Sequence, residues 1–342
     1  MTKWFEGSGP EEDVVVSTRI RIARNLEGYR FPHRMSIEES EKLTQEVLDA
    51  MKNLSDKSNY KFIRIRDLNP IERISYMEKH LISPGLVQKV NMGSFLLRDD
   101  EVITVMINEE DHLRIQVLFP GLNFEEGWEY SNEMDSFLED HLNFAFHEEF
   151  GYLTACPTNV GTGLRASAMV HIPSLAMSGH MGYLIQGLNK IGLTIRGLYG
   201  EGTEALGNLY QISNQTTLGE KEEKIIEKLK NVIIQVINKE RDMRESLFNN
   251  QRYQLENMVF RSLGILKYAR LISSKEAMSH LSNVRLGMEV GIIKDIKFSD
   301  ITELMIEIQP ASIQEKFNME LDNERIDVER ANIIRERLKH IE

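Results

Sequence analysis

Apolar and polar residues alternate most strictly near the N-terminus, where residues 14–23 read VVVSTRIRIA. Successive side chains of a strand face opposite sides, so Arg19 and Arg21 share one face and Ile20 and Ile22 share the other. Two neighbouring guanidinium groups offer forked donors that suit phosphate. The solvated outer face of an amphipathic strand is the commoner meaning of such a pattern. The segment therefore predicts a strand and leaves the role of its arginines open.

Strand and helix periods then follow one another until about residue 244. Capping patterns, turn residues and apolar spacing mark the limits of each element. The expected elements are helices that start after Ser36 and Asn69, consecutive strands within 90–119, helices over 123–150 and 175–188, strands over 193–199 and 208–213, and a long helix that follows Gly219. The expected core residues of the 123–150 helix are Trp128, Met134, Phe137, Leu138, Leu142 and Phe146.

The pattern changes after Arg244, where charged helical segments replace strands and glycines. Helix starts are expected near Ser273, Ser299 and Pro310. A chain of 342 residues exceeds the usual size of one hydrophobic core. We therefore predict two domains, a mixed domain over 1–243 and an all-helical domain over 244–342.

Charge and cysteine content narrow the classes of function. The 53 acidic residues outnumber the 41 basic ones, and the net charge of −12 argues against nonspecific nucleic-acid binding. A single cysteine excludes an internal disulfide framework and fits a reducing cytosol. The N-terminal residues lack the apolar core of a signal peptide, and no long apolar run predicts a membrane span. We expect a cytoplasmic protein.

One window of the chain departs from this acidic composition. No Asp or Glu occurs between Glu149 and Glu201, whereas the window holds Arg165, Arg196 and the only cysteine, Cys156. A glycine-bearing surface without carboxylates suits a polyanion, because nothing in it repels phosphate. The alternative is a buried segment that lacks acids because it is apolar.

A second candidate is an acidic corner that follows a predicted buried strand. Glu109, Glu110 and Asp111 stand in succession, close in sequence to Arg114. Such acids often form only a polar turn, but carboxylates are also held in this way beside a reacting cation. The sequence leaves both interpretations open.

Several familiar motifs are excluded. Residues 161–166 match G-x-G-x-x-A, but Pro157 interrupts the preceding segment and no acid follows at the distance that holds a ribose. The P-loop and the protein-kinase motifs are absent, and a single cysteine with poorly spaced histidines argues against a zinc site. The sequence leaves open a hydrolase in which Cys156 is the nucleophile and His112, His147 or His171 is the base. The surrounding arginines fit phosphate better than an acyl group.

Four segments together resemble the catalytic domain of phosphagen (guanidino) kinases. They occur in unbroken order within residues 14–241 and comprise STRIR at 17–21, NEEDHLR at 108–114, CPTNVGTGLRAS at 156–167, and RGLYGEGTE at 196–204, which leads into YQISN at 210–214. The resemblance implies an α+β fold with a largely antiparallel sheet flanked by helices. It also implies phosphoryl transfer from ATP to a guanidine.

Two features are similar to bacterial protein-arginine kinases of the McsB type. The STRIR segment begins at Ser17, which leaves no room for the leading helical domain of small-molecule guanidino kinases, and a helical domain follows Arg244. The resemblance therefore implies an open site for protein substrates. It also implies allosteric phosphoarginine binding at Asp327 and Arg330, although Ile326 replaces the first arginine of the family's R-D-x-x-R-A motif and only the neighbouring Arg325 offers a substitute.

The resemblance also implies roles at the site. Glu110 is the expected base, Glu201 the second carboxylate that grips the guanidinium, and Cys156, as a thiolate, the group that tunes its charge. Mg²⁺ is expected to be held through phosphates and water, with no metal site built from protein ligands alone. The residues expected to contact ATP are Ser17, Thr18, Arg19, Ile20, Arg21, His80, Arg114, Arg165, Ala166, Ser167, Ala168, Met169, Arg196, Gly197, Leu198, Tyr199, Gly200 and Glu201.

Partners follow from the same resemblance. It implies protein substrates with exposed arginines, a Clp-type protease that degrades marked proteins, a zinc-containing activator protein, and a stress repressor as one substrate. Charged helices with apolar stripes commonly pair, so we expect a homodimer. The alternatives are a kinase for a small free guanidine and a phosphoarginine-binding adaptor.

Overall fold

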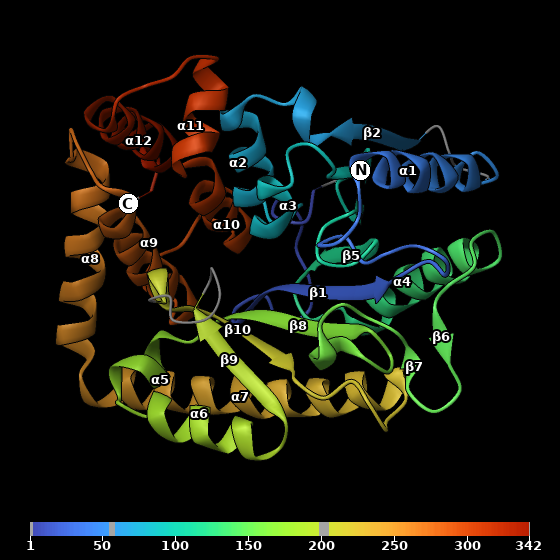
Figure 1. Cartoon of the computed structure of the whole chain (residues 1–342). Coiled ribbons are helices and arrows are strands. Elements are labelled where there is room, and N and C mark those ends of the chain that lie inside the picture. Colours follow the sequence, from blue (N-terminus) through green and yellow to red (C-terminus); the bar gives the residue numbers. More distant parts are fainter. Residues whose placement is uncertain (1–2, 55–58, 198–204, 342) are drawn as a thin grey trace.

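The computed structural model describes residues 3–54, 59–197 and 205–341. Within these ranges eight strands form one sheet in the order β2-β3-β4-β5-β1-β8-β10-β9, and every neighbouring pair is antiparallel (Figure 1). The strands are β1 (Val15–Arg24), β2 (Tyr60–Arg64), β3 (Ser94–Arg98), β4 (Ile103–Ile107), β5 (Leu113–Pro120), β8 (Leu164–His171), β9 (Leu193–Gly197) and β10 (Leu209–Asn214). The predicted antiparallel sheet flanked by helices is confirmed.

Helices cover both faces of this sheet and then form a region of their own. The helices that precede residue 251 are α1 (Ile37–Met51), α2 (Pro70–Glu78), α3 (Pro84–Gln88), α4 (Phe124–Glu139), α5 (Pro173–Met177), α6 (Met181–Lys190) and α7 (Glu222–Asn250). The C-terminal helices are α8 (Arg252–Tyr268), α9 (Ser274–Glu289), α10 (Phe298–Glu307), α11 (Pro310–Phe317) and α12 (Asn323–Leu338). None of the described helices is long and apolar enough to cross a membrane.

Each face of the sheet packs against its own cluster of apolar side chains. One cluster joins Ile20 and Ile22 of β1 to α1, α4 and α7. The other joins Phe95 of β3 and Met169 of β8 to the C-terminal helices α8–α12. In Figure 1, α7 lies below the central strands, α2, α3, α10, α11 and α12 lie above them, and α8 runs down the left side. The face of β1 that carries arginines is thus turned toward the second cluster.

Local sequence signals fixed several helix starts. Ser36 forms the predicted capping box with Glu39, and Asn69, the predicted cap before Pro70, forms a second box with Glu72. Each box satisfies two backbone donors that a helix N-terminus otherwise leaves free. The structure confirms both starts.

Other boundaries differ from the prediction. The helix expected over 123–150 ends at Glu139, and a small hairpin of β6 (Phe146–His147) and β7 (Gly151–Tyr152) follows it. Phe146, expected in the core, is 58 % exposed. The helix expected over 175–188 is divided into α5 and α6 at Gly179, whose φ of 75° is left-handed. The sequence pattern also failed to identify the central strand β8.

Helix α7 continues to Asn250 and therefore passes through the predicted domain boundary at residue 244. Because this one helix joins the two regions, it marks no boundary between domains at residue 244, and the division into two domains stays a prediction.

Candidate active site

The sheet register gathers arginines from neighbouring strands. Arg21 of β1 lies directly opposite Arg165 of β8, and Arg19 lies opposite Ser167. On the other side of β1, Ala23 faces Arg114 of β5. Arg196 of β9 pairs with Gln211 of β10. Like charges placed directly opposite on adjacent strands are destabilising, so this arrangement favours a bound anion.

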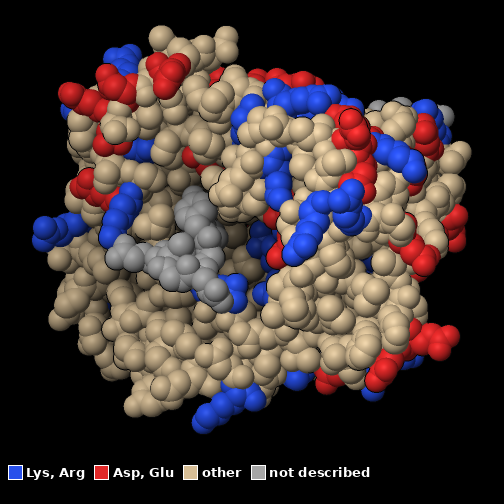
Figure 2. Space-filling model, in the orientation of Figure 1, with Lys and Arg blue, Asp and Glu red and all other residues tan. Residues whose placement is uncertain are grey.

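These arginines line two adjoining cavities. The larger has a volume of about 670 Å³ and the smaller of about 170 Å³, and both are lined by Arg21, Arg165 and Arg196. Figure 2 shows a hollow near the middle of one face, with Lys or Arg atoms on its visible wall. Further lining residues are Ala23, Glu110, Arg114, Cys156, Thr158, Asn159, Gly163 and Gln215 in the larger cavity, and Arg19, Met77, His80, Ile82, Ser83, Pro84, Gln116, Gly197, Gln211 and Ser213 in the smaller.

Mutual repulsion and burial perturb these cations. Burial, with the charges of Arg114 and Arg165, lowers the pKa of Arg19 to about 10. Burial and three neighbouring guanidinium groups lower the pKa of Arg21 well below its ordinary value, and only Glu109 opposes them. Burial and Arg196 likewise lower the pKa of Arg165. Phosphate oxygens would reverse each of these effects, so the residues present fit the triphosphate of ATP.

A second observation on Arg21 also indicates that it binds a ligand. Its buried Nε has no hydrogen-bond partner among the described residues. Buried guanidinium donors are normally satisfied, because leaving one without a partner costs about 1–3 kcal/mol. A ligand oxygen in the adjoining cavity would supply that partner.

The structure divides the acidic corner into three separate roles. The carboxylate of Glu109 is buried, lies 2.7 Å from Nη2 of Arg114 and accepts a hydrogen bond of 2.8 Å from Ser83. Asp111 is also buried and accepts hydrogen bonds from Asn25 and from the backbone N–H of Ala155, each 2.7 Å long. Only Glu110 lines the larger cavity. The corner is therefore more than a polar turn.

The environment of Glu110 favours a base. Its side chain is 44 % exposed, and its nearest cation is Arg114 at 3.3 Å. Burial raises the pKa of Glu110 in spite of Arg114, and the negative charges of Asp111 and Glu109 add to the rise. A carboxylate with a raised pKa binds a proton more readily, which suits general-base catalysis.

Cys156 enters the same cavity at the start of a short 3₁₀ turn, Pro157–Asn159. Its Sγ lies 3.0 Å from the hydroxyl of Thr158. The loop that follows passes close to the chain near Thr217, because a Cβ added at Gly161 would lie 2.3 Å from the carbonyl oxygen of Thr217. Asp111 holds the preceding residue, Ala155, as described above. Two anchors therefore fix Cys156 beside Glu110.

The histidines considered as partners of Cys156 are occupied elsewhere. His112 bonds to the backbone of Leu26 and Arg30. His171 bonds to Glu289 and Ser282, whereas His147 is exposed and contacts Phe150. No histidine belongs to the described lining of the larger cavity. This arrangement gives a Cys–His hydrolase no support.

Strand geometry divides the predicted ATP-contacting residues between two faces. Ile20, Ala166 and Ala168 lie in the apolar cluster on the far face. The hydroxyl of Thr18 bonds to Gly121 and Asn123. On the near face, Ser17, Arg19, His80, Ser167 and Met169 line a small extension of the cavity, and Gly197 lines the smaller cavity. Leu198, Tyr199, Gly200 and Glu201 lie outside the described residues.

Sequence reasoning assigned no role to Gln211 and Gln116. Oε1 of Gln211 accepts a hydrogen bond of 2.5 Å from Arg19, and Gln116 donates to the carbonyl oxygens of His80 and Leu81. His80 itself has a left-handed φ of 60°, and burial with the charge of Arg19 lowers its pKa to about 3. The period-2 pattern placed both glutamines in strands, and only the sheet order showed that they face the arginines.

The predicted phosphoarginine residues lie far from this cavity, on α12. Arg330 is 1 % exposed, and its guanidinium donates to the carbonyl oxygens of Ile308 and Ile272 and to Asp327. Ile326 is buried beside them, and the exposed Arg325 pairs with Glu329. Phosphoarginine binding at Asp327 and Arg330 stays a prediction.

Comparisons with known proteins agree with the fold and site. The family model described as ATP:guanido phosphotransferase, C-terminal catalytic domain, matches residues 42–243, and the model described as Protein-arginine kinase McsB C-terminal domain matches 252–342. A solved lombricine kinase has a TM-score of 0.61 and 23 % identity, with 70 % of each chain covered. A solved taurocyamine kinase of Schistosoma mansoni has a TM-score of 0.62 and 24 % identity over 75 % of this chain and 39 % of its own. Fold and site together define a guanidino phosphotransferase.

Curated relatives identify the particular family. The protein-arginine kinase of Clostridium tetani is 44 % identical, with 99 % of each chain covered. That of Desulforamulus reducens is 47 % identical over 99 % of this chain and 96 % of its own, and that of Clostridium novyi is 46 % identical over all of both. The chain therefore belongs to the protein-arginine kinase family, as the resemblance in the sequence predicted.

Proposed function

We propose that this chain transfers the γ-phosphoryl group of ATP to the guanidine of arginine side chains in proteins. One observation carries the proposal. Arg21 and Arg165 face each other, neither forms an ion pair with a carboxylate of the described residues, and Glu110 lines the same cavity. The arrangement provides for a polyanion and a cation side by side, which are the two reactants of such a transfer.

ATP, the phosphoryl donor, fits the arginine-lined side of the cavities. In this proposal Arg21, Arg165 and Arg196 neutralise phosphate oxygens, and the smaller cavity, with Arg19 and His80, receives the rest of the nucleotide. Mg²⁺ would arrive on the phosphates and be held through water. Positioning and charge neutralisation are the main tasks of an enzyme in phosphoryl transfer, because the reaction needs little covalent help.

The acceptor requires a base. An arginine side chain has a pKa above about 12, so its attacking nitrogen is protonated and a poor nucleophile. Glu110 would orient the guanidinium and take one proton from that nitrogen. A P–N bond then forms as the bond between the γ-phosphorus and the bridging oxygen breaks, and ADP leaves. Glu201 is expected to grip the other side of the guanidinium, and Cys156 to tune its charge.

Replacement of Glu110 tests the proposal directly. Glu110→Gln should lower the rate of phosphoarginine formation by roughly 10²–10⁴-fold, because the amide cannot accept the proton. ATP affinity should change by less than about twofold, since the phosphate-binding arginines remain. Glu126→Gln, at an exposed carboxylate of α4, makes the same chemical change away from the cavity and serves as the control. Unchanged turnover in Glu110→Gln would remove this residue from the mechanism.

The choice of acceptor separates the competing functions. Wild-type protein is incubated with ATP, an unfolded model protein and free arginine, and mass spectrometry locates the phosphate. Phosphate on the protein supports the proposal, whereas phosphate only on free arginine indicates a small-molecule guanidino kinase. Absence of ATP turnover together with binding of phosphoarginine would indicate an adaptor, in which case Asp327 and Arg330 become the residues to replace.

We further propose that the phosphorylated proteins are degraded by a Clp-type protease during stress, with a zinc-containing activator as partner, a stress repressor among the substrates and the cytoplasm as the compartment. The family resemblance and the lone cysteine support these points. Degradation of a model protein by such a protease only after phosphorylation tests the first of them.

A homodimer is also proposed. The outer face of α8 exposes Tyr253, Phe260 and Tyr268, which are 83 %, 48 % and 73 % exposed. Aromatic side chains on one helix face are typical of a surface that pairs. Light scattering, which measures the mass in solution, tests this point.

A further inference from the structure

Helix α9 of the C-terminal region contacts the ends of two strands that line the smaller cavity. The hydroxyl of Ser282, which is fully buried, lies 2.8 Å from Nε2 of His171 and accepts a hydrogen bond of 2.9 Å from Nδ2 of Asn208. His171 is the last residue of β8, and Asn208 immediately precedes β10. One hydroxyl of α9 therefore joins the ends of two adjacent strands.

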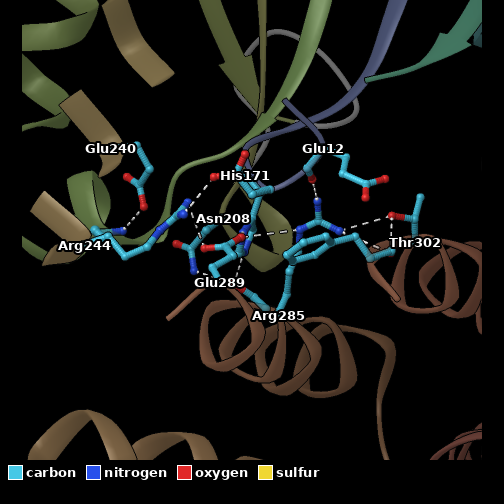
Figure 3. A network of polar contacts seen from close by, with 12 residues as sticks. Glu12, His171, Asn208, Glu240, Arg244, Arg285, Glu289 and Thr302 are labelled. Atoms are coloured by element: carbon cyan, nitrogen blue, oxygen red, sulfur yellow. Dashed lines mark hydrogen bonds and ion pairs between the residues drawn. The ribbon is translucent and has the colours of Figure 1, made fainter. Parts of the chain in front are cut away.

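The partners of Ser282 are themselves held in place. Nδ1 of His171 lies 2.8 Å from Oε1 of Glu289, and Arg244 of α7 lies 3.1 Å from the other oxygen of that carboxylate. Figure 3 shows His171, Asn208 and Glu289 within one group of polar side chains, with Arg244 and Arg285 on either side. A neutral imidazole protonated at Nδ1 donates to the carboxylate of Glu289 and accepts at Nε2 from the hydroxyl of Ser282. The group forms a rigid support.

The strand ends held by Ser282 lie next to residues that line the cavity. In the register of β8 and β10, His171 pairs with Leu209 and Met169 pairs with Gln211. Met169 and Gln211 face the small extension of the cavity, where Gln211 accepts the hydrogen bond from Arg19. Met169 is thus two residues from His171, and Gln211 is three residues from Asn208, the two residues that Ser282 contacts. A displacement of the strand ends would move Met169 and Gln211.

The backbone before β10 also depends on α9. Gly207 and Asn208 are both left-handed, with φ values of 61° and 53°. Successive left-handed residues are unfavourable unless their surroundings impose them. A Cβ added at Gly207 would lie 2.9 Å from the carbonyl oxygen of Met278 in α9. The turn therefore fits closely against this helix, and Ser282 fixes the second of its two left-handed residues.

We propose that Ser282 is a positioning residue for the nucleotide, which acts through Asn208 and His171 on Gln211 and Met169. This inference goes beyond the proposed function, because it assigns a role in ATP binding to a helix of the C-terminal region, outside the segment matched by the catalytic-domain model. It rests on the nucleotide occupying the arginine-lined cavity, and it is independent of the identity of the acceptor.

A matched pair of substitutions tests the inference. Ser262 of α8 is also buried, accepts a hydrogen bond of 3.0 Å from Asn283 and lies 3.1 Å from Nδ1 of His280. Ser262→Ala therefore removes an amide and an imidazole contact, as Ser282→Ala does, but entirely within the C-terminal helices. The two variants should lose similar unfolding stability. Direct titration with ATP should show weaker binding, by roughly fivefold, only in Ser282→Ala, a change that corresponds to one neutral hydrogen bond.

A second variant tests whether Ser282 acts through its hydrogen bond with Asn208. Asn208→Gly removes the amide but tolerates the left-handed backbone. It should weaken ATP binding to a similar extent, and the double variant with Ser282→Ala should be little weaker than either single one, because both changes break the same hydrogen bond. Equal ATP affinities in Ser262→Ala and Ser282→Ala, or effects of Ser282→Ala and Asn208→Gly that multiply, would overturn the inference. ATP binding without phosphorylation of proteins would contradict the proposed acceptor and leave this test valid.

Discussion

Arginines with buried nitrogen atoms occur in two regions of this molecule, and their partners differ. In the cavity, Arg21 faces Arg165 across neighbouring strands, and its Nε has no partner among the described residues. In the C-terminal helices, Arg330 is fully buried and donates to two carbonyl oxygens and to Asp327. The first arginine is surrounded mainly by like charge, and the second by acceptors.

This difference separates a binding group from a structural one. A guanidinium that is surrounded by acceptors has no capacity left for a ligand and stabilises the fold. A guanidinium buried among other cations is unfavourable in the free protein, and that unfavourable energy is relieved when an anion binds. Residue type alone does not distinguish the two cases, because both regions contain arginines with buried nitrogen atoms.

The largest expected effect is on ATP affinity, when the cavity residue Arg21 is replaced. Arg21→Gln should weaken ATP binding by roughly a hundredfold, because it removes a buried charge from the phosphate site. Its unfolding free energy should stay unchanged or rise, since the substitution also removes repulsion with Arg19 and Arg165. Nucleotide titration and urea unfolding measure the two quantities. A large loss of stability with unchanged ATP affinity would make Arg21 a structural residue.

The opposite result is expected at Arg330. Arg330→Met should lower the unfolding free energy by about 3 kcal/mol, because two buried carbonyl oxygens and Asp327 lose their donor. ATP affinity should change by less than about twofold. Urea unfolding measures the stability, and phosphoarginine titration provides the contrast. Loss of phosphoarginine binding at unchanged stability would instead show that Arg330 binds a ligand, as its motif predicts.

The smallest effect concerns a buried histidine beside the cavity. Burial and Arg19 lower the pKa of His80 from its ordinary value of 6.5 to about 3. Between these two values the unfolded chain binds a proton on this residue and the folded protein does not, so stability is lost as the pH falls below 6.5. The expected contribution is about 1.4 kcal/mol per pH unit.

His80→Asn should remove that contribution and make the loss of stability on acidification shallower by about one proton, since asparagine also tolerates the left-handed backbone. Urea unfolding at several pH values between 4.5 and 6.5 measures the slope. An identical slope in both proteins would mean that His80 is protonated in the folded state. His171 should contribute a similar slope, because burial and the nearby Arg285 and Arg244 also lower its pKa.

Local signals predicted much of the fold. The alternation in β1, the capping boxes at Ser36 and Asn69 and the long apolar stripe of α7 depend on neighbours in sequence, and each produced the expected element. These local signals failed where contacts between residues distant in sequence determine the structure. Strand β8 lies in the middle of the sheet, covered on both faces, and the small side chains of Ala166, Ser167 and Ala168 give its alternation little hydrophobic contrast. Phe146 kept a helical spacing, although the helix had already ended.

For the site, the motifs identified most of the chemically active residues, but they did not assign their individual roles. Glu109, Glu110 and Asp111 are neighbours in sequence and chemically alike. Only the folded chain shows that one pairs with Arg114, one holds Ala155 and one faces the cavity. Gln211 and Ser282 escaped notice because their role comes from elements far away in sequence.

The amino-acid sequence by itself determined the family, the two helical starts with capping boxes and the arginines and acids that the chemistry requires, because these depend on residue type and short spacing. The tertiary structure decided which arginines face one another across the sheet, which carboxylate faces the cavity and which helix contacts the strand ends. Charge pairing and burial depend on what the sheet order and helix packing bring together, and no local pattern encodes those distances.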